Sequence, residues 1–203
     1  MFAVGHLALG YLIAKASSKS LRVEVNLPLV LLLSVLPDID LILPYFEHRG
    51  ITHSIIVVTI AFTPVFLYYT RKSLPPFLAL AQHILIGDYI VGGHMGTQIL
   101  WPLTTTYYGL DVVLASQANV TLEIISFSIA IVVLILTKDL RKLLKPQKSS
   151  LLLTIPEAAI FGSAVIAGHN PISVELLLPH LIFFAIFGFA ILISLKKFAF
   201  DRS

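Results

Sequence analysis

Seven histidines and aspartates that could bind a metal ion lie within the first 88 residues of the chain: His6, Asp38, Asp40, His48, His53, His83 and Asp88. Histidine and carboxylate ligands without a thiolate are typical of hydrolytic metal sites, and the sequence contains no cysteine. An ionisable group carried into a membrane by a helix costs about 2.5 to 3.5 kcal/mol. Because the rest of the chain is strongly apolar, we expect these residues to serve a function.

The composition indicates an integral membrane protein. Of the 203 residues, 57% are hydrophobic and only 12% are charged, whereas soluble domains carry about 25% charged residues. The mean hydropathy is +0.93. A chain in a bilayer must satisfy its backbone hydrogen bonds internally, so this one is expected to span as helices. The sequence therefore predicts an all-α, polytopic membrane protein with a single domain over residues 1–203.

Apolar stretches predict about seven transmembrane or half-spanning helices in one bundle. They cover residues 2–15, 26–36, 51–70, 74–93, 119–137, 150–168 and 174–195. The first two are short and are expected to be half-spans or tilted helices that meet at a central cavity. Residues 1–118 would hold the metal site, and residues 119–203 would supply three supporting transmembrane helices.

The lysines and arginines predict the orientation in the membrane. On an alternating seven-helix path, thirteen of the fourteen basic residues fall on one face, and Arg49 alone falls on the other. Basic loops face the cytoplasm, so the N-terminus is expected outside the cell membrane and the C-terminus inside. This distribution explains the net charge of +3 without a nucleic-acid partner. The potential ligands then gather at the outer leaflet, although the charge argument did not use them.

The first motif is Pro37-Asp38-Ile39-Asp40. Proline removes a helical donor and disfavours helix at the residue before it, so the second helix should end here. In an extended stretch Asp38 and Asp40 would point to the same side. They could then bridge two metal ions, or one could be a ligand and the other a base. The alternative is an Asx turn or helix cap at the start of a loop.

The second motif, His48-Arg49-Gly50-Ile51-Thr52-His53-Ser54, places two imidazoles on either side of a glycine that permits a tight turn. Thr52 or Ser54 could cap the third helix and leave His53 in its first turn. The alternative is two interfacial histidines beside a capping threonine.

Arg49 lies between these two histidines. Its guanidinium could hold a phosphate or carboxylate of a substrate through a two-pronged contact. An ion pair with Glu47 or Asp40 is the structural alternative.

His83 and Asp88 lie five positions apart on a predicted spanning helix. In a regular α-helix they would point about 140° away from each other, so only one could reach a shared metal. A π-bulge or a kink at Gly87 would align both, and such bulges are frequent at functional sites. The alternative is a polar pair that holds helices together.

The order of these motifs, followed by Gly96 and by Leu100-Trp101-Pro102, resembles the YdjM-like family. That resemblance covers about residues 1–105 and implies a membrane-bound, metal-dependent hydrolase of the bacterial inner membrane. The family's histidine-to-aspartate spacing is four, whereas His83 and Asp88 are five apart, which puts one of these two ligands in doubt. More distantly, the order of ligands is similar to that of helical zinc-dependent phospholipases C, which implies a phosphoester substrate.

These observations favour a hydrolase with one or two divalent metal ions, zinc being expected. The ligands would come from the seven residues named above, with Asp88 as a ligand or close to the ligands. A metal-bound water would attack an ester or phosphoester, a carboxylate not committed to metal, such as Asp40, would act as base, and Arg49 would stabilise the developing anion. A site at the lipid–water boundary suits a lipid or lipid-linked substrate.

Two other functions are compatible with the same residues. An ion transporter or proton relay would explain why His83 and Asp88 lie within a membrane helix. A non-catalytic scaffold, in which the metal only ties helices together, would require a closed coordination sphere. The sequence makes no prediction about the oligomeric state.

Overall fold

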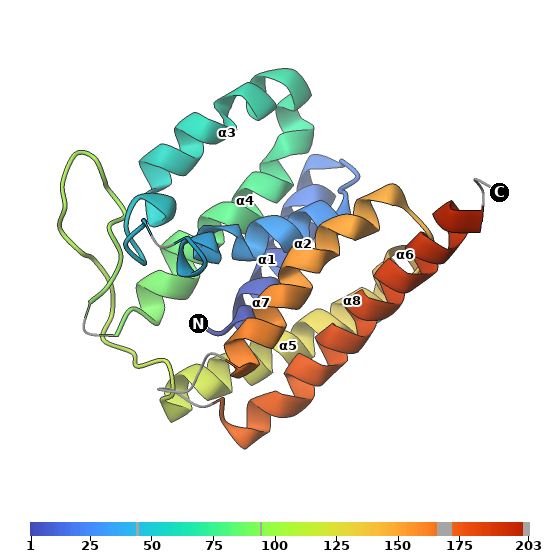
Figure 1. The fold of residues 1–203 in the computed structure, drawn as a ribbon. Coiled ribbons are helices and arrows are strands. Elements are labelled where there is room, and N and C mark those ends of the chain that lie inside the picture. The colour runs from blue at the N-terminus through green and yellow to red at the C-terminus, as the bar shows by residue number, and fades with distance from the viewer. Residues whose placement is uncertain (44, 94, 166–171, 201–203) are drawn as a thin grey trace.

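The computed structural model describes residues 1–43, 45–93, 95–165 and 172–200, and this part of the chain is built from helices (Figure 1). The α-helices are α1 (Ala3–Leu21), α2 (Leu27–Val35), α3 (Ile55–Tyr69), α4 (Leu74–Gln82), α5 (Gln117–Leu136), α6 (Asp139–Leu143), α7 (Thr154–Val165) and α8 (Val174–Phe200). Apart from the short α6, they correspond one to one with the seven predicted helices. The all-α prediction is therefore confirmed.

Helix α1 lies at the centre of the bundle, against α2, α4 and α5 (Figure 1). Most of its residues from Ala3 to Ala14 are buried, which suits a helix surrounded by others. It continues beyond the predicted end at residue 15 and stops at Leu21, because Arg22 adopts a left-handed backbone conformation with a φ of 54°. The N-terminal half of this central helix carries His6.

Three helical segments are long and apolar enough to cross a membrane: Ile55–Asp88, Gln117–Leu136 and Val174–Ala199. The first contains both α3 and α4, and the chain reverses between them at Thr70, whose φ is 50°. Helix α7 has 12 residues and is shorter than the predicted span 150–168, partly because Lys148–Leu153 forms a 3₁₀-helix. Residues 166–168 of that predicted span lie outside the described residues.

Helix α3 stands away from the rest of the bundle (Figure 1). None of its 15 residues, all of them described, is buried. Ile60 and Leu67 are 67% and 74% exposed. A continuous apolar surface of this kind is rare on a soluble protein and suits contact with lipid.

The hydrophobic core joins α1 to the C-terminal helices. Leu7 and Tyr11 of α1 share one buried cluster with Phe127 of α5 and with Phe183 and Phe187 of α8. The rings of Phe127 and Phe183 meet edge to face at 5.1 Å, and those of Phe183 and Phe187 stack at 5.4 Å. Helices α5 and α8 thereby fix the position of α1 and of His6.

Candidate metal centre

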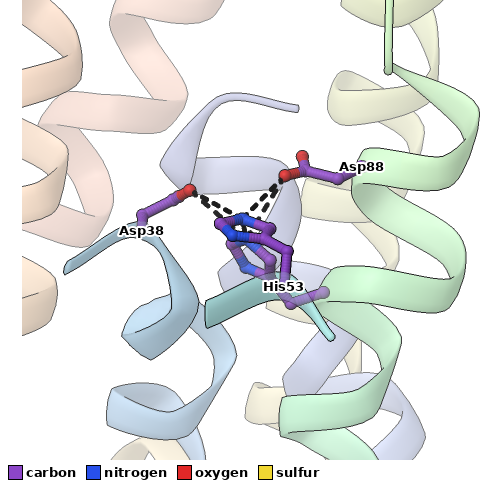
Figure 2. Close-up of side chains that lie close together, drawn as sticks. Asp38, His53 and Asp88 are labelled. Carbon is purple, nitrogen blue, oxygen red and sulfur yellow. Dashed lines mark hydrogen bonds and ion pairs between the residues drawn. The ribbon is translucent and has the colours of Figure 1, made fainter. Parts of the chain in front are cut away.

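Four side chains from three short helical segments converge beside α1. Asp38 comes from the 3₁₀-helix η1 (Leu36–Leu41), His53 from the 3₁₀-turn η2 (Ile51–His53), and His83 and Asp88 from the π-helix η4 (His83–Asp88). One nitrogen or oxygen atom of each lies within 4.8 Å of those of the other three. Figure 2 shows Asp38 and Asp88 on opposite sides of the imidazoles.

The ligating atoms face one another at short and similar distances. The Nε2 atoms of His53 and His83 are 3.3 Å apart. Asp88 Oδ2 lies 3.1 Å from His53 Nε2 and 3.6 Å from His83 Nε2, and Asp38 Oδ1 lies 3.6 Å and 3.3 Å from the same two atoms. Four donors placed tetrahedrally at about 2.0 to 2.1 Å from a zinc ion would be separated by about 3.3 Å. The donor set therefore fits a small tetrahedral cation.

Unsatisfied buried atoms support the same interpretation. Among the described residues, Asp88 Oδ2 and both ring nitrogens of His6 are buried without a hydrogen-bond partner. Buried polar atoms normally have a partner, and at a metal site the ion itself is the partner of the atoms that face it. His53 and His83 are fully buried and Asp88 is 1% exposed, so these three side chains are shielded from bulk solvent.

The π-helix η4 explains how both His83 and Asp88 reach the site. Its hydrogen bonds join residues five apart, so the two side chains lie close to one face of the helix. The sequence left open whether a π-bulge, a kink or a regular helix occurs here, and the structure has the π-helix. The extra residue in the His83-to-Asp88 spacing is thus accommodated without loss of either side chain.

The prediction of an extended Pro37-Asp38-Ile39-Asp40 stretch is wrong. Leu36 has helical dihedral angles, with φ −60° and ψ −37°, and Pro37 occupies an early position of η1, where its missing N–H costs nothing. Since a 3₁₀-helix turns about 120° per residue, Asp38 and Asp40 point in different directions. They contact opposite nitrogens of the His53 ring instead of sharing one side.

Both imidazoles are oriented by an acceptor on their other nitrogen. His83 Nδ1 lies 2.8 Å from the carbonyl oxygen of Ser34, and His53 Nδ1 lies 3.1 Å from Asp40 Oδ2. Such a contact makes Nδ1 the protonated nitrogen and leaves the Nε2 lone pair free for a metal. The residue following His53 is Ser54, which caps α3 by accepting a hydrogen bond from Val57 N, so His53 precedes the helix rather than lying in its first turn.

Asp40, His48 and His53 form a second group of potential ligands, which shares His53 with the first. Asp40 Oδ1 lies 3.0 Å from His48 Nδ1, and Asp40 Oδ2 accepts hydrogen bonds from Thr52 Oγ1 at 2.6 Å and from Arg49 N at 3.1 Å. Both oxygens of Asp40 therefore have hydrogen-bond partners within the protein, and they fix the positions of His48, Arg49 and Thr52. His48 is partly solvent-exposed and does not reach the group of four.

The charges of this region are strongly coupled. Burial alone would raise the pKa of Asp40, but hydrogen bonds from His48, His53 and Thr52 hold the pKa well below its ordinary value. Burial alone would lower the pKa of His53, but its contacts with carboxylates, Asp38 first among them, raise the pKa well above 6.5. The carboxylates around His53 therefore favour a positive charge at this position, which a bound metal ion would supply.

His6 lies beside the group of four and is not one of its members. Its Nε2 atom is 3.3 Å from Asp88 Oδ1, and its ring stacks on that of His83 with centroids 3.7 Å apart. This close approach depends on Gly87, because a Cβ atom there would lie 2.4 Å from His6 Cε1. The absence of a side chain at Gly87 thus leaves room for the ring of His6.

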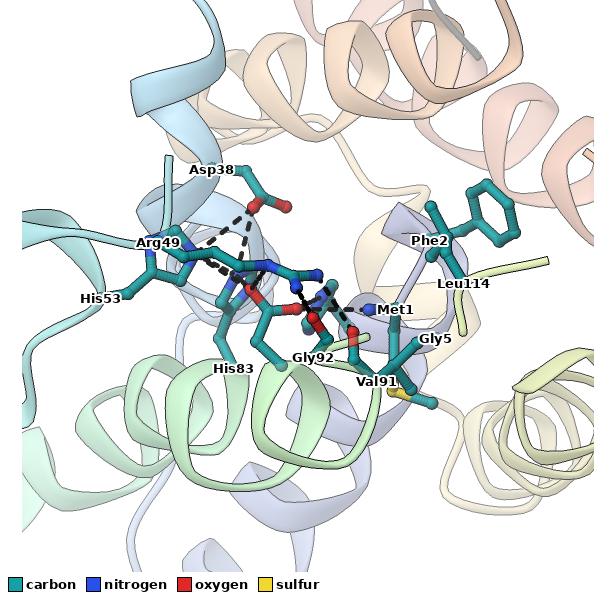
Figure 3. A network of polar contacts seen from close by, with 12 residues as sticks. Met1, Phe2, Gly5, Asp38, Arg49, His53, His83, Val91, Gly92 and Leu114 are labelled. Atoms are coloured by element: carbon teal, nitrogen blue, oxygen red, sulfur yellow. Dashed lines mark hydrogen bonds and ion pairs between the residues drawn. The ribbon is translucent and has the colours of Figure 1, made fainter. Parts of the chain in front are cut away.

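The guanidinium of Arg49 is already engaged (Figure 3). Its Nη1 donates to the carbonyl oxygen of Gly92, its Nη2 donates to that of Val91 at 3.0 Å, and its Nε lies 3.6 Å from Asp88 Oδ2. In this arrangement Arg49 ties the loop after η4 to the site and balances the charge of Asp88. Asp88, rather than Glu47 or Asp40, is its carboxylate partner.

Glu123 of α5 binds the start of α1, the helix that carries His6. It is fully buried and accepts hydrogen bonds from the backbone N–H groups of Phe2 at 2.7 Å and Gly5 at 3.1 Å, which start α1, and from Asn119 at 2.9 Å. These contacts cap the start of α1, just before His6.

The profile of the YdjM inner membrane protein family matches residues 1–191. The chain belongs to this family. The match extends well beyond the stretch of about 105 residues on which the resemblance in the motifs rests, so α5 and α7 and most of α8 are part of the family's common architecture. Comparison with curated proteins and with solved structures gave no significant match.

Proposed function

We propose that this protein is a membrane-embedded, metal-dependent hydrolase that cleaves an ester or phosphoester of a lipid or lipid-linked substrate. The observation that carries the proposal is the buried tetrahedral arrangement of Asp38, His53, His83 and Asp88 around one point. Imidazole and carboxylate donors without sulfur suit zinc used for hydrolysis. Membership of an inner membrane protein family supports the location.

Charge balance favours one divalent ion at this site. Asp38, Asp40 and Asp88 contribute three negative charges when ionised. A divalent cation, the Arg49 guanidinium and the N-terminal ammonium group, which both contact Asp88, would bring four positive charges against these three while both imidazoles stay neutral. A second divalent ion would leave a larger excess of positive charge. Buried charges are stable only when paired in this way.

Each residue then has a distinct part in the reaction. When bound, the metal would supply a water molecule with a pKa near about 7. His53 and His83 would hold the ion through Nε2, with Asp40 and the Ser34 carbonyl oxygen fixing their ring orientation. Asp88, which Arg49 would keep ionised, would be the third ligand, so that the fourth position stays open to water. Asp38, at the open edge, would accept the proton of the attacking water.

The site has one accessible edge. The side chain of Asp38 is 20% exposed, whereas those of His53, His83 and Asp88 are at most 2% exposed. A catalytic zinc keeps an open position for water or substrate, and a structural zinc is enclosed by four protein ligands. The exposure of Asp38 supports an enzyme over a metal-stabilised scaffold.

The orientation of the site follows from the distribution of basic residues, which favours a cytoplasmic C-terminus. The site would then face the outer leaflet, with α3 in the bilayer beside it. A substrate with a hydrolysable head group and a hydrocarbon tail would reach the metal without leaving the membrane.

The test is metal analysis of the purified protein followed by hydrolysis assays with lipid esters and lipid phosphates in reconstituted membranes. We expect about one equivalent of zinc and turnover of at least one class of lipid. His83→Ala should abolish both. His180→Ala is the matched control, because His180 is a buried histidine of α8 outside the two ligand groups. Equal metal content in the wild type and His83→Ala would overturn the proposal.

A further inference from the structure

An apolar groove with a volume of about 400 Å³ lies beside the candidate metal centre, between α3 and the end of α2. Val58, Ala61 and Phe62 of α3 form one wall, and Leu36 and Pro37 of η1 belong to the opposite wall. Its volume lies within the range of about 300 to 1,000 Å³ that is usual for ligand pockets.

One end of this groove is lined by direct sequence neighbours of two potential ligands. Thr52 lines the groove, and its Oγ1 donates a 2.6 Å hydrogen bond to Asp40 and lies 3.0 Å from His53 Nδ1. Pro37, on the other wall, directly precedes Asp38, the most exposed of the four potential ligands. The groove therefore borders the segments that carry Asp38 and His53, on the Nδ1 side of the His53 ring.

Helix α3, which lines the groove, belongs to the least buried of the three candidate membrane spans. All residues of α3 are described and none is buried, and the apolar window of its span is 0% buried. A hydrocarbon chain in the bilayer could enter sideways between α3 and η1. Among the lining residues, Thr52 at the metal end carries the polar side chain, so the groove changes from apolar to polar in the direction of the ligands.

We propose that this groove binds the hydrocarbon chain of a lipid whose ester or phosphoester group lies at Asp38 and His53. The inference rests on the proposed function and adds the substrate class: a single acyl or alkyl chain attached close to the hydrolysed bond. The chain packs against Val58, Ala61 and Phe62, and the head group lies at the end marked by Thr52.

The test is photolabelling of the full-length protein in phospholipid nanodiscs with a trace amount of a long-chain alkyl phosphate that carries a diazirine at the end of its tail. Label on the groove walls that unlabelled alkyl phosphate displaces is expected in the wild type. Ala61→Phe fills the groove and should reduce this displaceable labelling about tenfold. Ile60→Phe is the matched control on the same helix, because Ile60 is 67% exposed and outside the groove.

Val58→Phe provides a second variant on the same wall in case Ala61→Phe does not fold, and metal content reports whether each variant is folded. Equal displaceable labelling in Ala61→Phe, Val58→Phe and Ile60→Phe would overturn the inference, as would its absence in the wild type. Hydrolysis by the wild type is measured separately. Labelling without hydrolysis would support the groove as a lipid-binding site and reject the hydrolase. Hydrolysis without labelling would support the hydrolase and reject the groove as the lipid-binding site.

Discussion

A buried aspartate lies near each end of α1, and the two carboxylates have different partners. Near its C-terminal end, Asp139 is 1% exposed and contacts Lys15 Nζ at 2.5 Å, Tyr11 Oη at 3.1 Å and Lys142 Nζ at 3.4 Å. Near its N-terminal end, Asp88 is equally buried. Two imidazoles that carry their own carboxylate partners face its Oδ2 atom, which has no hydrogen-bond partner among the described residues.

This difference separates a charge that is fully paired within the protein from one that could bind a metal ion. Asp139 has donors on both oxygens and needs no further partner, as expected for a buried ion pair that joins helices. At Asp88, Oδ1 accepts from the N-terminal ammonium group at 3.2 Å, whereas Oδ2 and the Nε2 atoms of His53 and His83 point at a common centre. We therefore expect changes at Asp88 and its neighbours to alter metal binding, and changes at Asp139 to alter stability alone.

The largest expected effect comes from removing a ligand. His53→Ala should reduce the metal content of the purified protein from about one equivalent to almost none, because its Nε2 atom faces both Asp38 and Asp88. The measurement is elemental analysis after purification in a metal-containing buffer. The control variant His180→Ala should keep its metal. An unchanged metal content in His53→Ala would show that the cluster around Asp88 does not bind the metal and does not differ from Asp139 in this respect.

A smaller loss is expected from Gly87→Ala. The added Cβ would lie 2.4 Å from His6 Cε1 and 2.5 Å from His6 Nδ1, so His6 must move away from Asp88 and His83. We expect metal affinity to fall about 10- to 100-fold, as when an outer partner of a ligand is lost. The double variant His6→Ala/Gly87→Ala should bind metal as well as His6→Ala alone. Additive losses in competition titrations with a chelator would contradict this account of Gly87.

Asp40→Asn distinguishes a positioning role from a ligand role. Because Asp40 contacts the Nδ1 side of His53, we expect an affinity loss of about 10- to 100-fold with full occupancy at saturating metal. Isothermal titration of metal-free protein would measure both quantities. Failure to bind metal at any concentration would instead make Asp40 a ligand, as in the second group with His48.

Asp139→Asn is expected to leave the metal centre unchanged. Loss of the ion pair with Lys15 should destabilise the protein by about 1 to 3 kcal/mol, seen as a lower midpoint of thermal unfolding in detergent. Metal content should equal that of the wild type. A loss of metal would show that the two ends of the bundle are coupled.

The same variant predicts a dependence on pH. Burial alone would raise the pKa of Asp139, but hydrogen bonds from Lys15, Thr137 and Tyr11 and the charge of Lys15 hold it below 3.8. A carboxylate with a lowered pKa contributes stability above its unfolded pKa and loses it as the pH falls through the folded one. The difference in unfolding midpoint between wild type and Asp139→Asn should therefore be constant near neutral pH and shrink below about pH 4. A difference that persists undiminished at lower pH would contradict the role of the ion pair.

Much of the fold follows from local sequence patterns. The apolar stretches predicted the seven main helices because a chain in lipid has few alternatives to helix. Ser54 was one of two predicted caps for α3, and its side chain accepts the expected hydrogen bond from Val57 N. Such features depend on neighbouring residues, and a single sequence contains them.

The details of the site depended on contacts between distant segments. The extended geometry predicted for Asp38 and Asp40 was wrong, because proline is also favourable at the start of a helical turn and packing selected η1. The partner of Arg49 could not be predicted, since the carbonyl oxygens of Val91 and Gly92 lie more than 40 positions away in the sequence. The contacts of Glu123 with the start of α1 could not be predicted, because nothing in the sequence around Glu123 points to that helix.

The sequence by itself determined that this is a helical membrane protein and that imidazoles and carboxylates, without thiols, are the side chains that it offers to a metal ion. These are properties of residue type and periodicity. The tertiary structure alone decided that His83 and Asp88 meet at the same point, because a π-helix is weaker than an α-helix on its own and persists where packing holds it. It also decided which nitrogen of His53 faces the potential metal, because that choice rests on Asp40, thirteen residues earlier, meeting the opposite side of the ring.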